Sequence, residues 1–158
     1  MKAKRFFQPI VDNLNQLQVK GLIINGYQLK FSFSTLVADN LAAHMIGGFQ
    51  SSFSSGYFCR RCYIKYVDRN LPILLNKALC RTSIDHDDLI EQIILTPFKS
   101  PLMGIIGQSP IQDLIGFHPV MSLPADLMHD YIEGVCPLVM MILLKQASSM
   151  RLITYGEI

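Results

Sequence analysis

Two cysteines separated by two residues form the part of the sequence with the most recognisable chemistry. Cys59 and Cys62 lie in YFCRRCYIKYVDR, directly after a loop rich in Ser and Gly. This spacing lets one turn present both thiolates to a zinc ion, which binds sulfur or imidazole donors at about 2.0–2.3 Å. A thioredoxin-like redox pair would instead sit between a strand and a helix. Two unrelated buried thiols are the other alternative, and the position after a loop favours zinc.

A closed zinc site needs two more ligands from elsewhere in the chain. The candidates are the other two cysteines and three of the histidines: Cys80, His86, His118, His129 and Cys136. His118 lies in a segment rich in Pro, and His129 lies on an expected helix, so both could reach the cysteine pair. Cys80 and His86 stay open as alternatives.

Several acidic residues occupy positions where they could serve catalysis or only structure. Asp126, His129, Asp130 and Glu133 follow the spacing i, i+3, i+4 and i+7, which places them close together along one expected helix. This polar stripe is either a functional face or an exposed face without a role. Asp39 lies where an expected strand passes into a short helix. That position favours an N-cap, although enzymes with α/β folds also place catalytic acids at strand ends.

The charge distribution is uneven along the chain, although the net charge is only +2. The segment 57–81 contains a single acid, Asp68, and six basic residues: Arg60, Arg61, Lys65, Arg69, Lys77 and Arg81. Such a segment could bind phosphates. Composition alone favours a solvated surface. The sign reverses in the segment 85–91, which is acidic.

Length and composition limit the class of protein. With 158 residues the chain can form one domain with a core. Half of the residues are hydrophobic and 16% are charged, which is apolar for a free-standing domain and suggests a piece of a larger protein. The apolar run GVCPLVMMILL is about eleven residues, which favours a buried helix over a membrane span. Irregularly spaced cysteines without a secretory signal indicate a reducing compartment.

Local patterns predict the elements that must position these residues. Apolar spacing predicts a helix over 9–20, and Asn25-Gly26 predicts a hairpin. Alternation from Leu29 predicts a strand that ends at Asp39, followed by a short helix closed by Gly47-Gly48. Further predictions are a loop over 50–58, a helix within 71–95 capped by Ser83 or Asp85, irregular chain over 96–124, and a helix over 124–144 interrupted at Gly134 and Pro137.

Taken in order, these motifs resemble a known family. VADNLAAHMIGGFQSSFSSGYFCRRCYI, followed by FHPVMSLPADLMHDYIEGV, is similar to transposases of the CACTA group and related elements of animal genomes. The resemblance implies an RNase H-like DDE/D nuclease core interrupted by an insertion that carries the cysteine pair and histidines. In such enzymes three acids hold two divalent ions, magnesium or manganese, which activate the attacking oxygen and stabilise the leaving oxygen. It also implies transposon-end DNA as a partner, a homodimer and a nuclear location.

The resemblance assigns roles to individual residues. Asp39 matches the second catalytic acid, and Glu133 is the candidate for the third, with Asp130 as its substitute. Cys59 and Cys62 match the zinc-binding pair. The remaining assignments are His129 as the stronger histidine ligand, His118 as the weaker one, and Arg60, Arg61, Lys65 and Arg69 as candidate DNA contacts.

The expected fold class is α/β and helix-rich, with a partial RNase H-like core. Residues 1–49 would be a remnant of that core, residues 50–123 a zinc-binding insertion, and residues 124–158 a helix that returns to the core. Asp12, the acid before Asp39, lies in an expected helix and does not match the first acid. We therefore expect a catalytically incomplete transposase fragment. The alternatives are a non-catalytic, zinc-stabilised module that binds DNA or protein, or a reading frame without a stable product. No membrane partner is expected in any of these cases.

Overall fold

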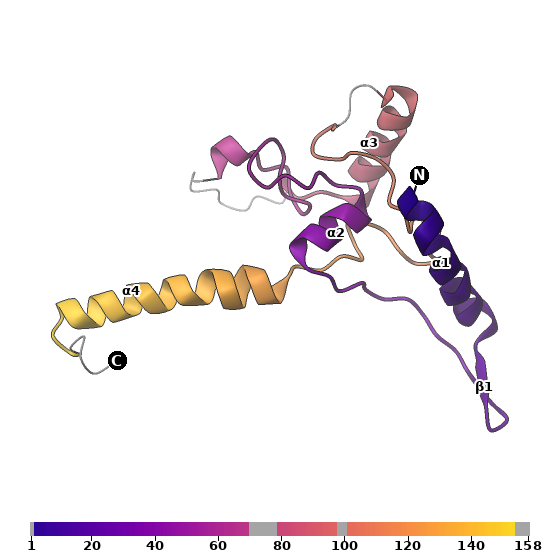
Figure 1. Cartoon of the computed structure of the whole chain (residues 1–158), viewed down its shortest axis with the longest axis horizontal. Helices are drawn as coiled ribbons and strands as arrows, with labels where there is room; N and C mark the ends of the chain where they lie inside the picture. The colour runs from indigo at the N-terminus through magenta and orange to yellow at the C-terminus, as the bar shows by residue number, and fades with distance from the viewer. Residues whose placement is uncertain (1, 70–78, 98–100, 154–158) are drawn as a thin grey trace. The chain divides into compact units, whose positions relative to one another are not determined.

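The computed structural model describes residues 2–69, 79–97 and 101–153. The chain divides into two compact units, Met1–Pro124 and Ala125–Ile158. Figure 1 shows the elements of both. The first part of the helix predicted within 71–95 lies outside the described residues, as do short parts of the irregular segment and of the C-terminal segment.

The first element, α1 (Lys2–Lys20), is longer than the helix predicted over 9–20 and includes Pro9. Its inward side carries Val11, which is 2% exposed and belongs to the core. The helix ends at Gly21, whose φ of 72° is left-handed and whose N–H donates to the Leu17 carbonyl at 2.9 Å. A glycine in this conformation is a common helix stop, so the predicted end is confirmed.

The predicted hairpin is confirmed. β1 (Leu22–Ile24) and β2 (Tyr27–Leu29) are antiparallel, with Ile24 opposite Tyr27. Asn25 and Gly26 connect them with φ values of 50° and 81°. Two successive positive φ values are typical of a type I′ turn, whose twist matches that of the flanking strands.

The strand predicted to end at Asp39 is wrong: residues 30–39 have no regular secondary structure. Other contacts take up backbone groups of this segment. Phe33 N–H donates to Gln18 Oε1 at 2.7 Å, and Leu36 N–H donates to the Ser122 carbonyl at 2.8 Å. Without a neighbouring strand, alternating apolar residues do not make a ladder. The described sheet consists of β1 and β2, and the RNase H-like core stays a prediction.

The predicted short helix is confirmed as α2 (Asn40–Gly47), capped at both ends. Asp39 Oδ1 accepts a hydrogen bond from Ala42 N–H at 2.7 Å, which is the N-cap geometry. Gly48 ends the helix with a φ of 75°. A Cβ at Gly48 would lie 2.1 Å from the Gly107 carbonyl oxygen, so the two chain segments can approach only because residue 48 is glycine.

The next helical elements are η1 (Tyr66–Asp68), a 3₁₀ turn, and α3 (Ser83–Leu95). The N-cap of α3 is Thr82, whose Oγ1 accepts from Asp85 N–H at 3.1 Å. The sequence predicted Ser83 or Asp85 for this role, and both are incorrect. Thr82 is also a good cap, and its extended backbone conformation decides the matter.

The core of the first unit depends strongly on the segment 101–124, which is irregular as predicted. One cluster of buried residues consists of Val11, Ala43, Ile111, Leu114, Phe117 and Leu123. A second consists of Phe49, Ile93, Ile105 and Val120. Pro and Gly prevent regular structure here, yet the apolar side chains are still buried between α1, α2 and α3.

The second unit contains η4 (Leu127–Val135), which is π-helical, and α4 (Cys136–Ser149). Asp126 caps η4, so the predicted helical start at Pro124 is early. The predicted interruption appears as the change of helix type. Cys136 N–H donates to the Tyr131 carbonyl five residues back, and Pro137, which has no N–H, follows in the first turn of α4.

The prediction of a buried helix for the last apolar run is not met within this structure, because none of the α4 residues is buried. Together η4 and α4 form a helical stretch, Leu127–Ser149, of 23 residues. By length and composition alone this stretch could cross a membrane, a test that core helices of soluble proteins also pass.

Candidate metal centre

The cysteine pair forms a compact turn in which backbone N–H groups point at both sulfur atoms. Cys59 Sγ accepts from Arg61 N–H at 3.3 Å. Cys62 accepts a backbone hydrogen bond from Ile64, again two residues further along the chain. The thiols of Cys59 and Cys62 are also hydrogen-bonded to each other. Hydrogen bonds to sulfur favour the thiolate, which is the form that binds metal ions.

Charge in this turn explains why the pair suits a cation. Burial, above all, raises the pKa of the Cys62 thiol to about 11; the neighbouring Cys59 acts in the same direction, and Ile64 and Arg81 oppose the shift. The Cys62 thiol is therefore protonated near neutral pH, and two adjacent thiolates would repel each other. A divalent ion between the sulfurs removes that repulsion and releases the protons. The donor set therefore fits zinc.

Arg81 holds the backbone of this turn in place through hydrogen bonds. Its side chain is 5% exposed and donates from Nε to the Cys59 carbonyl at 3.1 Å and from Nη2 to the Met103 carbonyl at 2.5 Å. The guanidinium also lies 4.4 Å from the centre of the Tyr63 ring. Burial lowers the pKa of Arg81 from its usual value, although the nearby thiols oppose the shift. Arg81 is therefore a structural residue.

Cys80 lies directly opposite Cys62 in an isolated antiparallel bridge. The bridge is flanked by hydrogen bonds from Tyr63 N–H to the Leu79 carbonyl at 2.8 Å and from Arg81 N–H to the Arg61 carbonyl at 3.0 Å. From the sequence, Cys80 was one alternative ligand among several, because no local pattern predicts which segment lies opposite the cysteine pair.

His118 belongs to a different cluster, with His86 and Asp87. His118 Nε2 lies 3.1 Å from Asp87 Oδ1, and His86 Nδ1 lies 3.4 Å from the same oxygen. Among the residues that the structure describes, these three are the group of possible metal ligands whose atoms lie within 4.8 Å of one another. The sequence prediction paired His118 with the cysteines and did not identify Asp87.

Hydrogen bonds in this cluster connect α3 to the segment 118–120. His118 Nδ1 accepts from Val120 N–H at 3.1 Å, so the neutral ring carries its proton on Nε2 and donates it to Asp87. A metal on Nε2 would have to displace that proton while Val120 still donates to Nδ1. Burial, above all, lowers the pKa of His86, whose ring is 3% exposed.

His129 is held by Asp126 at the start of η4. Its Nδ1 lies 2.6 Å from Asp126 Oδ2, and its backbone N–H donates to Asp126 Oδ1 at 3.1 Å. A carboxylate on one imidazole nitrogen is the arrangement that commonly orients a metal-binding histidine through the other. His129 belongs to the second unit and the cysteine pair to the first, and its role as a ligand stays a prediction.

The predicted catalytic acids are also divided between the units. Asp39 belongs to the first unit, where its carboxylate caps α2. Glu133 and the substitute Asp130 lie in η4 of the second unit, and both are exposed. The structure thus gives Asp39 the structural role that its position favoured, and the catalytic assignment stays a prediction.

The candidate DNA contacts separate into one buried and three exposed residues. Arg60 is 5% exposed, and its guanidinium donates to Asn40 Oδ1 at 2.8 Å and to the Pro124 carbonyl. These contacts within the first unit engage the side chain, and the assignment of Arg60 as a DNA contact stays a prediction. Arg61, Lys65 and Arg69 are exposed. The Arg69 guanidinium lies 3.8 Å from the centre of the Tyr66 ring.

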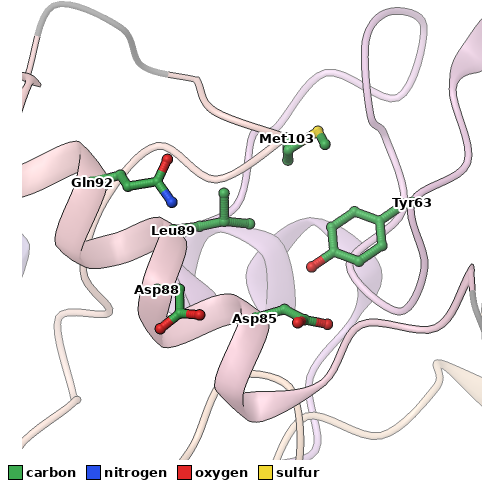
Figure 2. A pocket seen from close by; sticks show the side chains of 6 residues that line it. All are labelled: Tyr63, Asp85, Asp88, Leu89, Gln92 and Met103. Carbon is green, nitrogen blue, oxygen red and sulfur yellow. The ribbon is translucent and has the colours of Figure 1, made fainter.

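An open, acidic cleft lies beside α3. Figure 2 shows Asp85, Asp88, Leu89 and Gln92 on the helix α3, with Tyr63 and Met103 on other segments of the chain. The cleft has a volume of about 360 Å³. Burial raises the pKa of Tyr63, and the nearby Asp85 acts in the same direction. Two carboxylates disfavour the binding of a phosphate group in this cleft.

Comparison of the chain with protein-family models, with curated proteins and with solved structures gave no match. The likeness to transposases therefore rests on the motifs quoted above.

Proposed function

We propose that this chain is a zinc-stabilised module derived from a DDE/D transposase, and that it binds DNA without cleaving it. The observation that supports the proposal best is the turn in which backbone N–H groups point at both Cys59 and Cys62. Transposase descent is supported by the motif order in the sequence. A module of this kind is the alternative that we set beside a catalytic fragment.

Zinc has a clear structural task in this chain. The cysteine turn lies in the segment 50–65, which has no helix. It is connected to the rest of the unit by an isolated bridge and by side-chain hydrogen bonds such as those of Arg81. A metal ion bound by the folded turn and not by the unfolded chain adds its binding energy to folding.

A non-catalytic role follows from the use of Asp39. Two-metal chemistry needs carboxylates that converge on ions about 3.5–4 Å apart. Asp39 instead accepts the Ala42 N–H at the start of α2, and the segment before it is not a strand. We therefore expect neither magnesium nor manganese to support DNA cleavage by this chain.

DNA nicking tests this part of the proposal. We expect no conversion of supercoiled DNA to the nicked form with Mg²⁺ or Mn²⁺, and the same result for Asp39→Ala. Nicking by the wild-type chain that disappears in Asp39→Ala would show that the chain is catalytic and that the cap is not the main role of Asp39.

The DNA-binding surface is the exposed basic face of the cysteine turn. Arg61, Lys65 and Arg69 are exposed. Lys65 and Arg69 also lie against the Tyr57 and Tyr66 rings, which restricts their side chains. Basic side chains beside aromatic rings suit a nucleic-acid backbone, because the rings can also stack on bases.

Charge reversal tests that surface. Lys65→Glu and Arg69→Glu should each weaken duplex DNA binding and reduce the slope of log K against log salt by about 1. Lys20→Glu, at an exposed position at the end of α1, is the matched control and should have a smaller effect. Equal losses in all three variants would mean that the turn is not the DNA site.

A further inference from the structure

The segment 79–81, which faces the cysteine turn through an isolated bridge, carries a third cysteine opposite the second. Cys62 and Cys80 are bridge partners, and the flanking hydrogen bonds join Tyr63 to Leu79 and Arg61 to Arg81. Because the bonds flank the pair and do not join its members, this is a non-hydrogen-bonded pair. In such pairs both side chains point to the same face and approach most closely.

The geometry points to Cys80 as the third thiolate ligand of the metal ion held by Cys59 and Cys62. This inference rests on the proposed zinc site and names a ligand that the transposase resemblance does not supply. Directly opposed residues have Cβ atoms about 4.5–5.5 Å apart, and one metal ion binds two sulfurs at about 2.3 Å each. The three sulfur atoms are not within 4.8 Å of one another in this structure, so the inference requires the Cys80 side chain to rotate about its Cα–Cβ bond when the ion binds.

Hydrogen bonds hold the segment 79–81 against the cysteine turn. Arg81 follows Cys80 and bonds to the cysteine turn twice, through its backbone N–H to the Arg61 carbonyl and through Nε to the Cys59 carbonyl. These bonds fix Cys80 opposite the turn before any metal arrives. Preorganised ligands lower the cost of ordering the site when metal binds.

Two histidines of the same unit, His118 and His44, are less suitable as the third ligand. His118 donates to Asp87 and accepts from Val120, so both of its ring nitrogens are engaged. His44 Nδ1 is bonded to the Gln50 carbonyl, and its ring is 2% exposed. Cys80 is exposed, so its side chain can turn toward the ion without breaking a buried contact.

The site would therefore be a three-thiolate centre for a soft divalent ion. Zn²⁺ binding replaces three S–H protons with three Zn–S bonds, which leaves one net negative charge on the site. The Arg81 guanidinium lies close enough to offset that charge, since both thiols of the turn act on its pKa. Zinc prefers four ligands, so one position is left for a water molecule.

Cobalt substitution of the full chain under reducing conditions tests this inference. Thiolate-to-Co²⁺ charge-transfer absorption grows with the number of bound thiolates. In Cys80→Ser we expect it to fall by about one third, because two thiolates instead of three bind the ion. Zinc affinity, measured by competition with a chromophoric chelator, should fall at least about 10-fold, as expected when a ligand is lost. Cys136→Ser, in the second unit, is the control and should match the wild type.

The outcomes separate this inference from the proposed function. If Cys59→Ser abolishes cobalt absorption while Cys80→Ser leaves its intensity and the zinc affinity unchanged, the inference is wrong and the zinc site stands without Cys80. If the wild-type chain binds no cobalt or zinc, both are wrong. Cys80→His guards against misfolding: it should restore zinc affinity while the charge-transfer band stays reduced, and failure to restore affinity in a folded protein also contradicts a ligand at position 80.

Discussion

Single polar side chains connect segments that have no regular structure in common. Arg81 is the clearest case, because it bonds to the carbonyls of Cys59 and Met103 and stacks on the Tyr63 ring. Arg60 does the same between Asn40 and Pro124. Each guanidinium thereby donates to oxygens of segments that are far apart in the sequence, and a hydrogen bond from a charged donor contributes about 1.5–3 kcal/mol.

Replacing Arg81 should destabilise the protein strongly. Arg81→Met keeps most of the side-chain volume but leaves two carbonyls without their donor, so we expect a loss of about 2–5 kcal/mol in the free energy of unfolding. Arg5→Met, at an exposed position on α1, should change it by less than about 0.5 kcal/mol. Chemical denaturation measures both, and similar values for the two variants would show that Arg81 is not structural.

Buried histidines should make stability depend on pH. Burial, above all, lowers the pKa of His44 from 6.5, and the charges of Arg60 and Arg81 act in the same direction. Below pH 6.5 the unfolded chain therefore binds a proton that the folded chain resists. This stability contribution is complete above the unfolded pKa and is lost as the pH falls.

The check compares the wild type with His44→Gln, which keeps a donor for the Gln50 carbonyl. Between pH 7 and pH 5 the wild-type free energy of unfolding should fall more steeply than that of the variant. The difference between the two slopes should correspond to the uptake of up to about one proton on unfolding. Parallel curves would mean that His44 does not titrate differently in the folded and unfolded states.

At the scale of elements, local signals identified what local geometry determines. The Asn25-Gly26 turn, the short helix after Asp39 and the stop at Gly48 follow from residues that adopt positive φ or cap helices. The strand predicted over the segment 30–39 does not form, because alternating apolar and polar residues make a strand only where another strand can pair with them. Only part of the candidate metal site could be predicted from the sequence. The spacing of Cys59 and Cys62 was visible there, whereas the position of Cys80 depends on a bridge that no local pattern encodes.

Two glycines offer a matched test of element geometry. Both Gly26 and Gly48 have φ values near 80°, but a Cβ at Gly26 meets nothing within 4 Å, whereas one at Gly48 meets the Gly107 carbonyl at 2.1 Å. Gly26→Ala should cost about 1–2 kcal/mol from backbone strain alone. Gly48→Ala should cost clearly more, and equal losses in thermal unfolding would contradict the close approach of these segments.

At the scale of the whole molecule, the first unit contains both buried clusters and the cysteine turn. The second unit consists mainly of η4 and α4, and the apolar residues of α4 are exposed in this structure. Folding of the first unit should therefore depend little on the second. The basic turn and the metal centre both belong to the first unit.

A chain that ends at Pro124 should keep the first unit intact. We expect it to unfold in one cooperative transition and to bind zinc through Cys59, Cys62 and Cys80. Circular dichroism during heating, together with the zinc content, checks this expectation. A truncated chain that folds but has lost its zinc would show that the first unit does not hold the metal ion by itself.

The most direct test of the account is the metal content of the whole chain. Native mass spectrometry of protein purified under reducing conditions should show one zinc ion per chain, and Cys59→Ser with Cys62→Ser should show none. A wild-type chain that is folded and monodisperse without any bound metal would contradict the account.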